Sequence, residues 1–321
     1  MKDTVQTVTG PKKVSELGKT LIHEHLLIGW PGWQGDSAFP FNRKEAIKHC
    51  CGVLEKLKGL GVKTFVDPCP SDLGRDPEFM AECAQKTGMN VVCAAGYYKE
   101  DLGGSHFRFR AGFGSDVTAE VAELYQKEIE DGIGSTGIKV GLIKCATGEG
   151  SIKPYEESLL RAAARAQKAT GVPIITHTDH GSLGDKQLEI FLSEGVKPDR
   201  VGIGHSDDRA DLAYHASILD KGAFLSFDRF GLEILFPNKL RIASLIALLG
   251  IGYEKQMLVS HDTVNCWLGR PLPSQMLPVI SDWEPTYIFR IVLPKLREVG
   301  ISEETIATLL VDNPRRFFAG S

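Results

Sequence analysis

Histidine and carboxylate residues recur at the ends of apolar segments along this chain. The first of these segments contains His23-Glu24-His25, and residues i and i+2 of a strand point to the same side. If that side is the interior of a barrel, the two imidazoles can bind one metal ion. Otherwise they are polar residues at a strand end that bond to backbone or water. Imidazole and carboxylate groups together suit zinc and neighbouring first-row ions.

Three later apolar segments end in the same residue types. Pro173–His177 and Val201–His205 each end in histidine, and Met257–His261 is followed by Asp262. Taken singly, each histidine has a structural explanation. Together, four histidines and one aspartate at four equivalent strand ends predict a metal site, because barrel enzymes place their sites at the carboxyl ends of strands.

A lysine lies late in the apolar run Gly137–Cys145. Alternation places Lys144 on the same face as Leu142 and Val140, where a bare ammonium beside metal ions would be desolvated and repelled. A neutral lysine amine can instead add carbon dioxide and become a carbamate, an anionic ligand with two oxygens that can bridge two ions. The alternative is a lysine that reaches solvent from the strand end. Beside the histidines, we favour the carbamate.

These side chains need a set of parallel strands to position them. Short apolar runs predict strands at Leu21–Ile28, Thr64–Asp67, Asn90–Ala95, Gly137–Cys145, Pro173–His177, Val201–His205, Ala223–Asp228 and Met257–His261. Amphipathic stretches predict helices at Arg43–Leu60, Asp76–Thr87, Val117–Asp131, Tyr155–Thr170, Asp185–Glu194, Asp211–Lys221, Asn238–Leu249, Trp283–Val299 and Ser302–Leu310.

Eight strands, each followed by a helix, predict a single α/β domain over residues 1–321. Its expected fold is a (β/α)8 TIM barrel with a binuclear metal site at the carboxyl ends of the strands. A doubly wound open sheet is the alternative. Such a sheet usually has a glycine-rich phosphate loop after its first strand, where this chain has His-Glu-His-Leu.

The composition argues against several classes of protein. Lys and Arg total 37 against 41 Asp and Glu, a formal net charge of −4 without a basic block, so nucleic acid and anionic membrane surfaces are poor partners. No apolar run approaches the roughly 20 residues of a membrane-spanning helix, and Met1–Val8 has no apolar signal core. Seven cysteines without a CxxC motif predict reduced thiols and a cytoplasmic protein.

The order of these motifs resembles the phosphotriesterase family of the amidohydrolase superfamily, especially its phosphotriesterase-like lactonases. The resemblance runs from Thr20-Leu21-Ile22-His23-Glu24-His25 to Asp312-Asn313-Pro314-Arg315-Arg316-Phe317-Phe318. It implies two divalent ions, zinc first with manganese, cobalt or iron as alternatives, bridged by N6-carboxylated Lys144 and a hydroxide. A buried ion would be held by His23, His25 and Asp262, and a more exposed ion by His177 and His205. His261 alternates away from Asp262 and is expected outside the ligand set.

The resemblance also implies catalytic roles. Gly96-Tyr97-Tyr98 is similar to a lactonase pattern in which a tyrosine reaches the nucleophilic water or the substrate, with Tyr98 preferred and Tyr97 in reserve. Phe227–Gly231 is lactonase-like as well, with Arg229 where true phosphotriesterases have a histidine that relays protons. Arginine stays protonated near neutral pH and is a poor relay. Asp262 would take the proton of the bridging hydroxide and deliver it to the leaving alkoxide.

Two loops depart from the lactonase pattern and leave the substrate open. The loop after the first strand carries Trp30 and Trp33, and the loop after Asp262 carries Cys266 and Trp267. We expect these side chains to line the substrate pocket, although the packing of a long loop would explain the tryptophans equally well.

The sequence therefore predicts a metal-dependent hydrolase of ester bonds. The first hypothesis is a lactonase that opens acyl-homoserine or other γ/δ-lactones and has some organophosphate triesterase activity. Hydrolysis of phosphotriesters, phosphoesters or other carboxylic esters is the alternative, and a non-catalytic metal-binding barrel is a third reading. The partner is a small-molecule lactone or ester, and the resemblance alone implies a homodimer.

Overall fold

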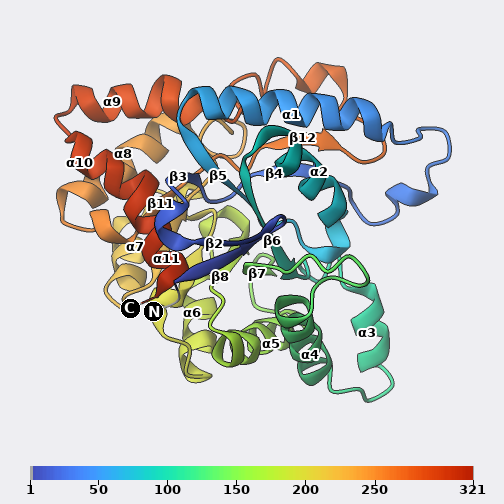
Figure 1. Cartoon of the computed structure of the whole chain (residues 1–321). Coiled ribbons are helices and arrows are strands. Elements are labelled where there is room, and N and C mark those ends of the chain that lie inside the picture. The colour runs from blue at the N-terminus through green and yellow to red at the C-terminus, as the bar shows by residue number, and fades with distance from the viewer. Residues whose placement is uncertain (1–2, 321) are drawn as a thin grey trace.

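The computed structural model describes residues 3–320, and an eight-stranded sheet forms its centre. The strands run in the order β11-β10-β9-β8-β7-β6-β5-β3, and every ladder between neighbours is parallel. They are β3 (Lys19–Leu21), β5 (Val62–Asp67), β6 (Asn90–Gly96), β7 (Leu142–Thr147), β8 (Ile174–Thr178), β9 (Val201–Ile203), β10 (Phe224–Phe227) and β11 (Met257–Val259). The sheet curves into a barrel with helices around it (Figure 1), so the predicted fold class is confirmed and the open sheet is wrong.

Most predicted helices are present with small differences at their ends. The helices that alternate with the barrel strands are α1 (Arg43–Gly59), α2 (Pro77–Thr87), α4 (Val117–Glu130), α5 (Pro154–Thr170), α6 (Gly184–Ser193), α7 (Leu212–Leu219) and α8 (Asn238–Gly250). Their ends follow local chemistry. Before α2, for example, the Asp76 carboxylate accepts a hydrogen bond from the Phe79 backbone N–H, Pro77 occupies the first turn, and Gly88 ends the helix at φ +71°.

The last helices differ from the prediction. The helix expected over Trp283–Val299 starts later, as a π-helical turn at Ile288–Val292 that leads into α9 (Leu293–Glu298). The helix expected over Ser302–Leu310 is α10 (Glu303–Ala307), followed by a second π-helical turn at Thr308–Asp312 and by α11 (Asn313–Ala319). No helix within residues 3–320 is long and apolar enough to cross a membrane.

Three features were not predicted. An antiparallel hairpin, β1 (Thr4–Thr7) and β2 (Gly10–Lys13), crosses in front of the barrel in Figure 1. A short helix, α3 (Ser105–Ala111), precedes α4. The segment after Asp262 contains a strand, β12 (Val264–Trp267), which pairs in parallel with β4 (His25–Ile28) above the barrel.

The first predicted strand, Leu21–Ile28, is in fact two strands. β3 ends at Leu21, a bend covers Ile22 and His23, and β4 begins at His25 with a different partner. The simple alternation that we used to pair His23 with His25 is therefore wrong as a description of the backbone. Both imidazoles nevertheless face the same cavity.

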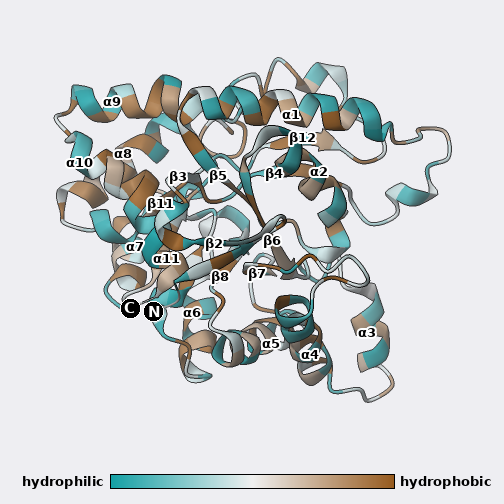
Figure 2. Cartoon of the chain, in the orientation of Figure 1, coloured by the Kyte–Doolittle hydropathy of each residue, from teal (hydrophilic) through white to brown (hydrophobic). Residues whose placement is uncertain are grey.

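The apolar core has an inner and an outer part. Inside the barrel, side chains from several strands form a layer that includes Val66, Leu142, Ile175 and Leu258, and Ile22, just after β3, belongs to the same cluster. The hairpin and α11 cover this layer at the amino-terminal end of the barrel, with Val5 and Phe317 in the same cluster. The outer part lies between strands and helices, and Figure 2 shows the corresponding brown strands beneath helices with mixed faces.

Candidate metal centre

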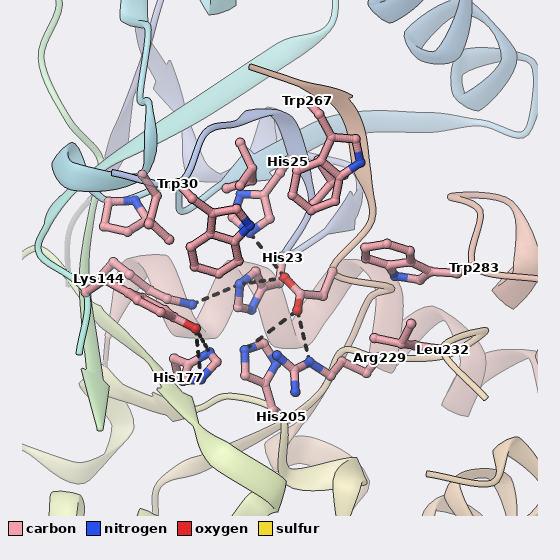
Figure 3. Close-up of a pocket in the computed structure, with 16 residues that line it drawn as sticks. His23, His25, Trp30, Lys144, His177, His205, Arg229, Leu232, Trp267 and Trp283 are labelled. Carbon is pink, nitrogen blue, oxygen red and sulfur yellow. Dashed lines mark hydrogen bonds and ion pairs between the residues drawn. The ribbon is translucent and has the colours of Figure 1, made fainter. Parts of the chain in front are cut away.

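A cavity of about 160 Å³ opens at the carboxyl ends of the barrel strands. All six predicted metal-type residues line it, namely His23, His25, Lys144, His177, His205 and Asp262. Figure 3 shows His23, His25, Lys144, His177 and His205 gathered around the centre of the cavity, with Trp30, Trp267 and Trp283 beside them. The structure thus brings together residues that lie as many as 239 positions apart in the sequence. The hydrogen bond from Thr263 N–H to Glu24, beside these six residues, spans that separation.

Strand alternation explains how the cavity gets its polar floor. Leu142 and Ile175 point into the packed barrel interior, and the residues two positions later, Lys144 and His177, lie one layer higher in the cavity. On this inward face of each strand, the residue type therefore changes from apolar to ionisable between one inward-pointing residue and the next. This arrangement is typical of barrel enzymes, whose interior is a packed core and whose site lies at the carboxyl ends.

Each of the four histidines is held by a carboxylate through one ring nitrogen. His25 Nδ1 lies 2.9 Å from Asp67 Oδ1, and His177 Nε2 lies 2.7 Å from Asp179 Oδ1. The other two share one carboxylate, with Asp228 Oδ2 at 2.7 Å from His23 Nδ1 and Asp228 Oδ1 at 2.8 Å from His205 Nδ1. Such partners fix the tautomer and leave the opposite nitrogen lone pair free for a metal.

The Nε2 atoms of His23, His25 and His205 converge on Asp262. Its Oδ1 lies 3.1 Å from His25 Nε2 and 3.4 Å from His23 Nε2, and its Oδ2 lies 3.8 Å from His205 Nε2. One ligand atom from each of His23, His205 and Asp262 lies within 4.8 Å of the others. Four carboxylate-backed imidazoles around an aspartate fit divalent ions of the zinc type.

The pKa values favour the ligand forms of most of these residues. Burial, helped by Arg229, lowers the pKa of His205 well below its usual value, and burial lowers that of His177 to about 4. His25 behaves differently, because hydrogen bonds to Asp262 and Asp67 overcome the effect of burial and raise its pKa to about 9. His25 thus carries a proton between the carboxylates of Asp67 and Asp262, and a bound metal ion would replace that proton.

Lys144 is buried among the metal-type residues. Its Nζ lies 2.9 Å from His23 Nε2, and only 2% of the residue is exposed. Burial lowers the pKa of Lys144 to about 8, although Asp262 and Asp228 oppose that shift. A substantial fraction of the amine is therefore neutral near physiological pH, which is the form that reacts with carbon dioxide.

Arg229 lies at the edge of the cavity within a chain of alternating charges. Its Nε donates to Asp262 Oδ2 at 3.0 Å, and its Nη1 donates to Asp208 Oδ2 at 2.6 Å. Arg241, which is fully buried, donates to the other oxygen of Asp208 at 2.7 Å. Arg229 consequently restrains the carboxylate of Asp262 and carries positive charge beside the cavity.

The structure separates the two adjacent tyrosines. Tyr98 lines the cavity, with its hydroxyl 3.2 Å from His177 Nε2. Tyr97 is directed into the outer core, where its ring packs against Phe107 at 5.1 Å and Tyr125 at 6.4 Å between centroids. Only Tyr98 is placed to reach a molecule in the cavity.

The Tyr98→Phe variant should lose activity without losing metal. It removes one hydroxyl from the cavity, and the loss of one donor to a developing oxyanion typically costs about 10²–10³ in kcat. Metal content, measured by elemental analysis, should not change. Tyr97→Phe is the matched control and should leave kcat unchanged. Full activity in Tyr98→Phe, or an equal loss in both variants, would contradict this role.

The predicted loop residues divide in the same way. Trp30 and Trp267 line the cavity. Trp33 packs against Phe41 with centroids 6.5 Å apart, and Cys266 directs its sulfur toward Cys50 at 3.7 Å, so the structure does not bring either into the lining.

Several residues of the site were not predicted. Asp67 and Asp179 were not singled out, and Asp228 was named only as the end of the predicted strand Ala223–Asp228. Their signal is a carboxylate at or just after a strand end, the same signal that drew attention to Asp262. Trp283 and Leu232 complete the apolar wall, and their sequence positions gave no sign of it.

Comparisons with known proteins agree with this architecture. The family model that matches is the phosphotriesterase family, over residues 3–318. A phosphotriesterase homology protein of Mycobacterium tuberculosis is 36% identical, over 98% of this chain and 97% of its own length. An aryldialkylphosphatase of Saccharolobus solfataricus is 35% identical, over 95% of this chain and 96% of its own.

Solved structures give the same result. The organophosphorus hydrolase of Deinococcus radiodurans superposes with a TM-score of 0.96 at 43% identity, covering 98% of this chain and 97% of its own. A structure from the molecular engineering of organophosphate hydrolysis activity from a weak promiscuous lactonase template has a TM-score of 0.95 at 42% identity, covering 98% and 99%.

The barrel and its cavity define an enzyme of the ester-hydrolysing class, as the similar proteins are. The chain belongs to the phosphotriesterase family, and the resemblance described from its motifs is confirmed.

Proposed function

We propose that this protein is a single-domain, two-metal lactonase with weaker activity on organophosphate triesters. The observation that carries the proposal is the joint presence of the Tyr98 hydroxyl and the Arg229 guanidinium in a cavity floored by four carboxylate-backed histidines. The similarity to a lactonase template and to organophosphorus hydrolases supports the same substrate range.

The chain offers two overlapping sets of ligands. In this proposal, one ion would be held by His23, His25 and Asp262 and the other by His177 and His205. Lys144 would serve as a ligand to both as a carbamate, formed when its neutral amine adds carbon dioxide and releases a proton. When bound, two divalent ions supply a nucleophilic water at neutral pH and polarise the bond under attack.

The protein side chains then handle protons and position the substrate. Asp262 accepts the proton released during attack and delivers it to the ring oxygen that leaves. Arg229 holds that carboxylate through its Nε contact of 3.0 Å, and the Tyr98 hydroxyl donates toward the oxygen that gains charge. Trp30, Trp267 and Trp283 provide an apolar wall for the hydrocarbon part of a lactone.

A comparison of substrates with and without chelator tests the proposal. We expect cleavage of γ- and δ-lactones with a higher kcat/KM than that of an aryl dialkyl phosphotriester. Prolonged treatment with chelator should abolish both activities, and zinc, manganese, cobalt or iron should restore them. Metal-free protein with no response to added ions would contradict the two-metal site. Metal-dependent phosphotriesterase activity above all lactone activities would favour the second candidate, a phosphotriesterase.

Arg229→His should shift the preference toward phosphotriesters. An imidazole at this position titrates near neutral pH and can relay a proton through Asp208, which the arginine cannot. We expect the ratio of phosphotriester to lactone kcat/KM to rise by about 10²-fold, the low end of the range for general acid–base catalysis. The exposed Arg290→His is the control. An unchanged ratio would refute the relay argument.

We also propose that the enzyme is a cytoplasmic homodimer. Light scattering coupled to size-exclusion chromatography measures the mass directly, and a monomer at micromolar concentration would contradict the dimer.

A further inference from the structure

The barrel has one seam at which its strands form no ladder within the described residues. The ladders run from β11 to β3 around the sheet, but none joins β3 directly to β11. At the cavity end of this seam, Asp262 N–H donates to the His23 carbonyl at 2.9 Å, and His25 N–H donates to the Thr263 carbonyl at 2.8 Å. The seam therefore lies between the metal-type residues of the first and last strands.

Glu24 fills this seam with a fully buried carboxylate. Its Oε1 accepts hydrogen bonds from Ser260 Oγ at 2.8 Å, from His261 N–H at 2.9 Å and from His261 Nδ1 at 2.5 Å. Its Oε2 accepts from Thr263 N–H at 3.1 Å and from Thr263 Oγ1 at 2.5 Å. Five donors from one four-residue segment thus converge on a single side chain.

These bonds flank the backbone of Asp262. Asp262 has φ +55°, a left-handed conformation that residues other than glycine rarely adopt. The carboxylate of Glu24 binds the N–H groups on both sides of it, at His261 and Thr263, one with each oxygen. With this turn the Asp262 side chain lies in the cavity, and the hydrogen bonds of Glu24 compensate for an unfavourable backbone conformation.

The same network extends to the cavity wall. His261 Nε2 accepts a hydrogen bond from the Ile288 N–H at 3.0 Å, so this nitrogen carries no proton and the ring is neutral, with its proton on Nδ1 toward Glu24. The His261 carbonyl accepts from Trp283 Nε1 at 2.9 Å. Glu24 thereby links the metal-type residues to the segment that supplies the Trp283 wall.

We infer that Glu24 is a positioning residue that sets the direction of the Asp262 ligand by closing the barrel seam around it. The inference rests on the proposed two-metal site, and it assigns a role to the residue between His23 and His25 that the ligand set does not use. Glu24 does not line the cavity. Residues that orient metal ligands typically contribute about 10- to 100-fold to metal affinity or activity.

Glu24→Gln tests the inference, because glutamine keeps the shape but replaces one acceptor oxygen by a donor NH2 that faces other donors. Apoprotein is titrated with cobalt(II) in competition with a chelator, and the dissociation constant and the visible absorption of the bound ion are recorded. We expect Glu24→Gln to bind cobalt(II) with a dissociation constant about 10- to 100-fold higher than that of the wild type, and with an altered absorption spectrum.

Glu128→Gln is the matched control. Glu128 is also buried, at 7% exposure, and pairs with Arg75 through two contacts of 2.7 Å outside the cavity. This variant should lower the melting temperature but leave the cobalt dissociation constant and spectrum unchanged. If Glu24→Gln does not fold, Thr263→Ala replaces it, since it removes one donor to Glu24 and should weaken cobalt binding by about tenfold.

The possible results separate the two proposals. Wild-type protein that binds no cobalt overturns the two-metal function and this inference with it. Wild-type protein that binds cobalt, together with a folded Glu24→Gln or Thr263→Ala of unchanged affinity and spectrum, overturns only the role of Glu24.

Discussion

Lys144→Ala is expected to lose nearly all activity and most of the bound metal. In the proposed site the carbamate of this lysine would be a ligand common to both ions, and its Nζ lies 2.9 Å from His23 Nε2. Alanine cannot form a carbamate, so two cations would face each other without the anion between them. We expect kcat/KM to fall by at least about 10³-fold, which corresponds to about 4 kcal/mol of transition-state stabilisation. Elemental analysis should find fewer than two metal ions per chain.

The control for this variant is Lys139→Ala. Lys139 belongs to the same segment but precedes β7 and does not line the cavity. It should retain metal and activity. Two ions per chain in Lys144→Ala would show that no carbamate bridge is needed. In the wild type, mass spectrometry under non-denaturing conditions should detect the added carbon dioxide, which acid releases.

Asp262→Asn is expected to reduce kcat strongly while the protein stays folded. The amide is nearly isosteric with the carboxylate, but it cannot accept the proton released during attack. General acid–base groups contribute about 10²–10⁴-fold, and we expect a loss within this range. The contact between Arg229 Nε and Asp262 Oδ2 would lose its charge, yet the backbone hydrogen bonds on either side of residue 262 remain.

Two further measurements identify the cause of that loss. Circular dichroism and the melting temperature should show a folded variant, and metal analysis should show how far affinity contributes. The pH profile is the most informative, because a lost general base flattens the acidic limb of kcat. A variant that keeps kcat within about threefold of wild type, below the usual range for general acid–base catalysis, would contradict the proton-accepting role.

The metal-type residues were accessible to sequence reasoning because they follow strand periodicity. Leu142 and Lys144, or Ile175 and His177, share a face by the two-residue repeat, and parallel strands gather their carboxyl ends at one place. The argument succeeded for His23 and His25 for a different reason than expected. The strand ends before His23, and after a bend at Ile22 and His23 both rings face the cavity.

Other positions could not be assigned from the sequence. A carboxylate at a strand end, such as Asp67, has the same local signature whether it binds a metal, a histidine or a helix end. Neighbouring residues cannot be assigned to opposite faces of a strand when the strand itself is not recognised. Cys266 and Trp267 of β12 therefore seemed equivalent, although Cys266 faces Cys50 and Trp267 lines the cavity. Trp283 reaches the cavity only through the packing of the last helices.

The first and last elements of the described chain lie together at the end of the barrel opposite the cavity. Thr4 of β1 and Phe318 of α11 line the same surface hollow, and Figure 1 shows α11 beside the first strands. An immobilising tether or a fused reporter attached at either end would therefore project away from the mouth of the cavity. The enzyme can be anchored to a solid support through its ends with its catalytic opening turned toward the flowing solution.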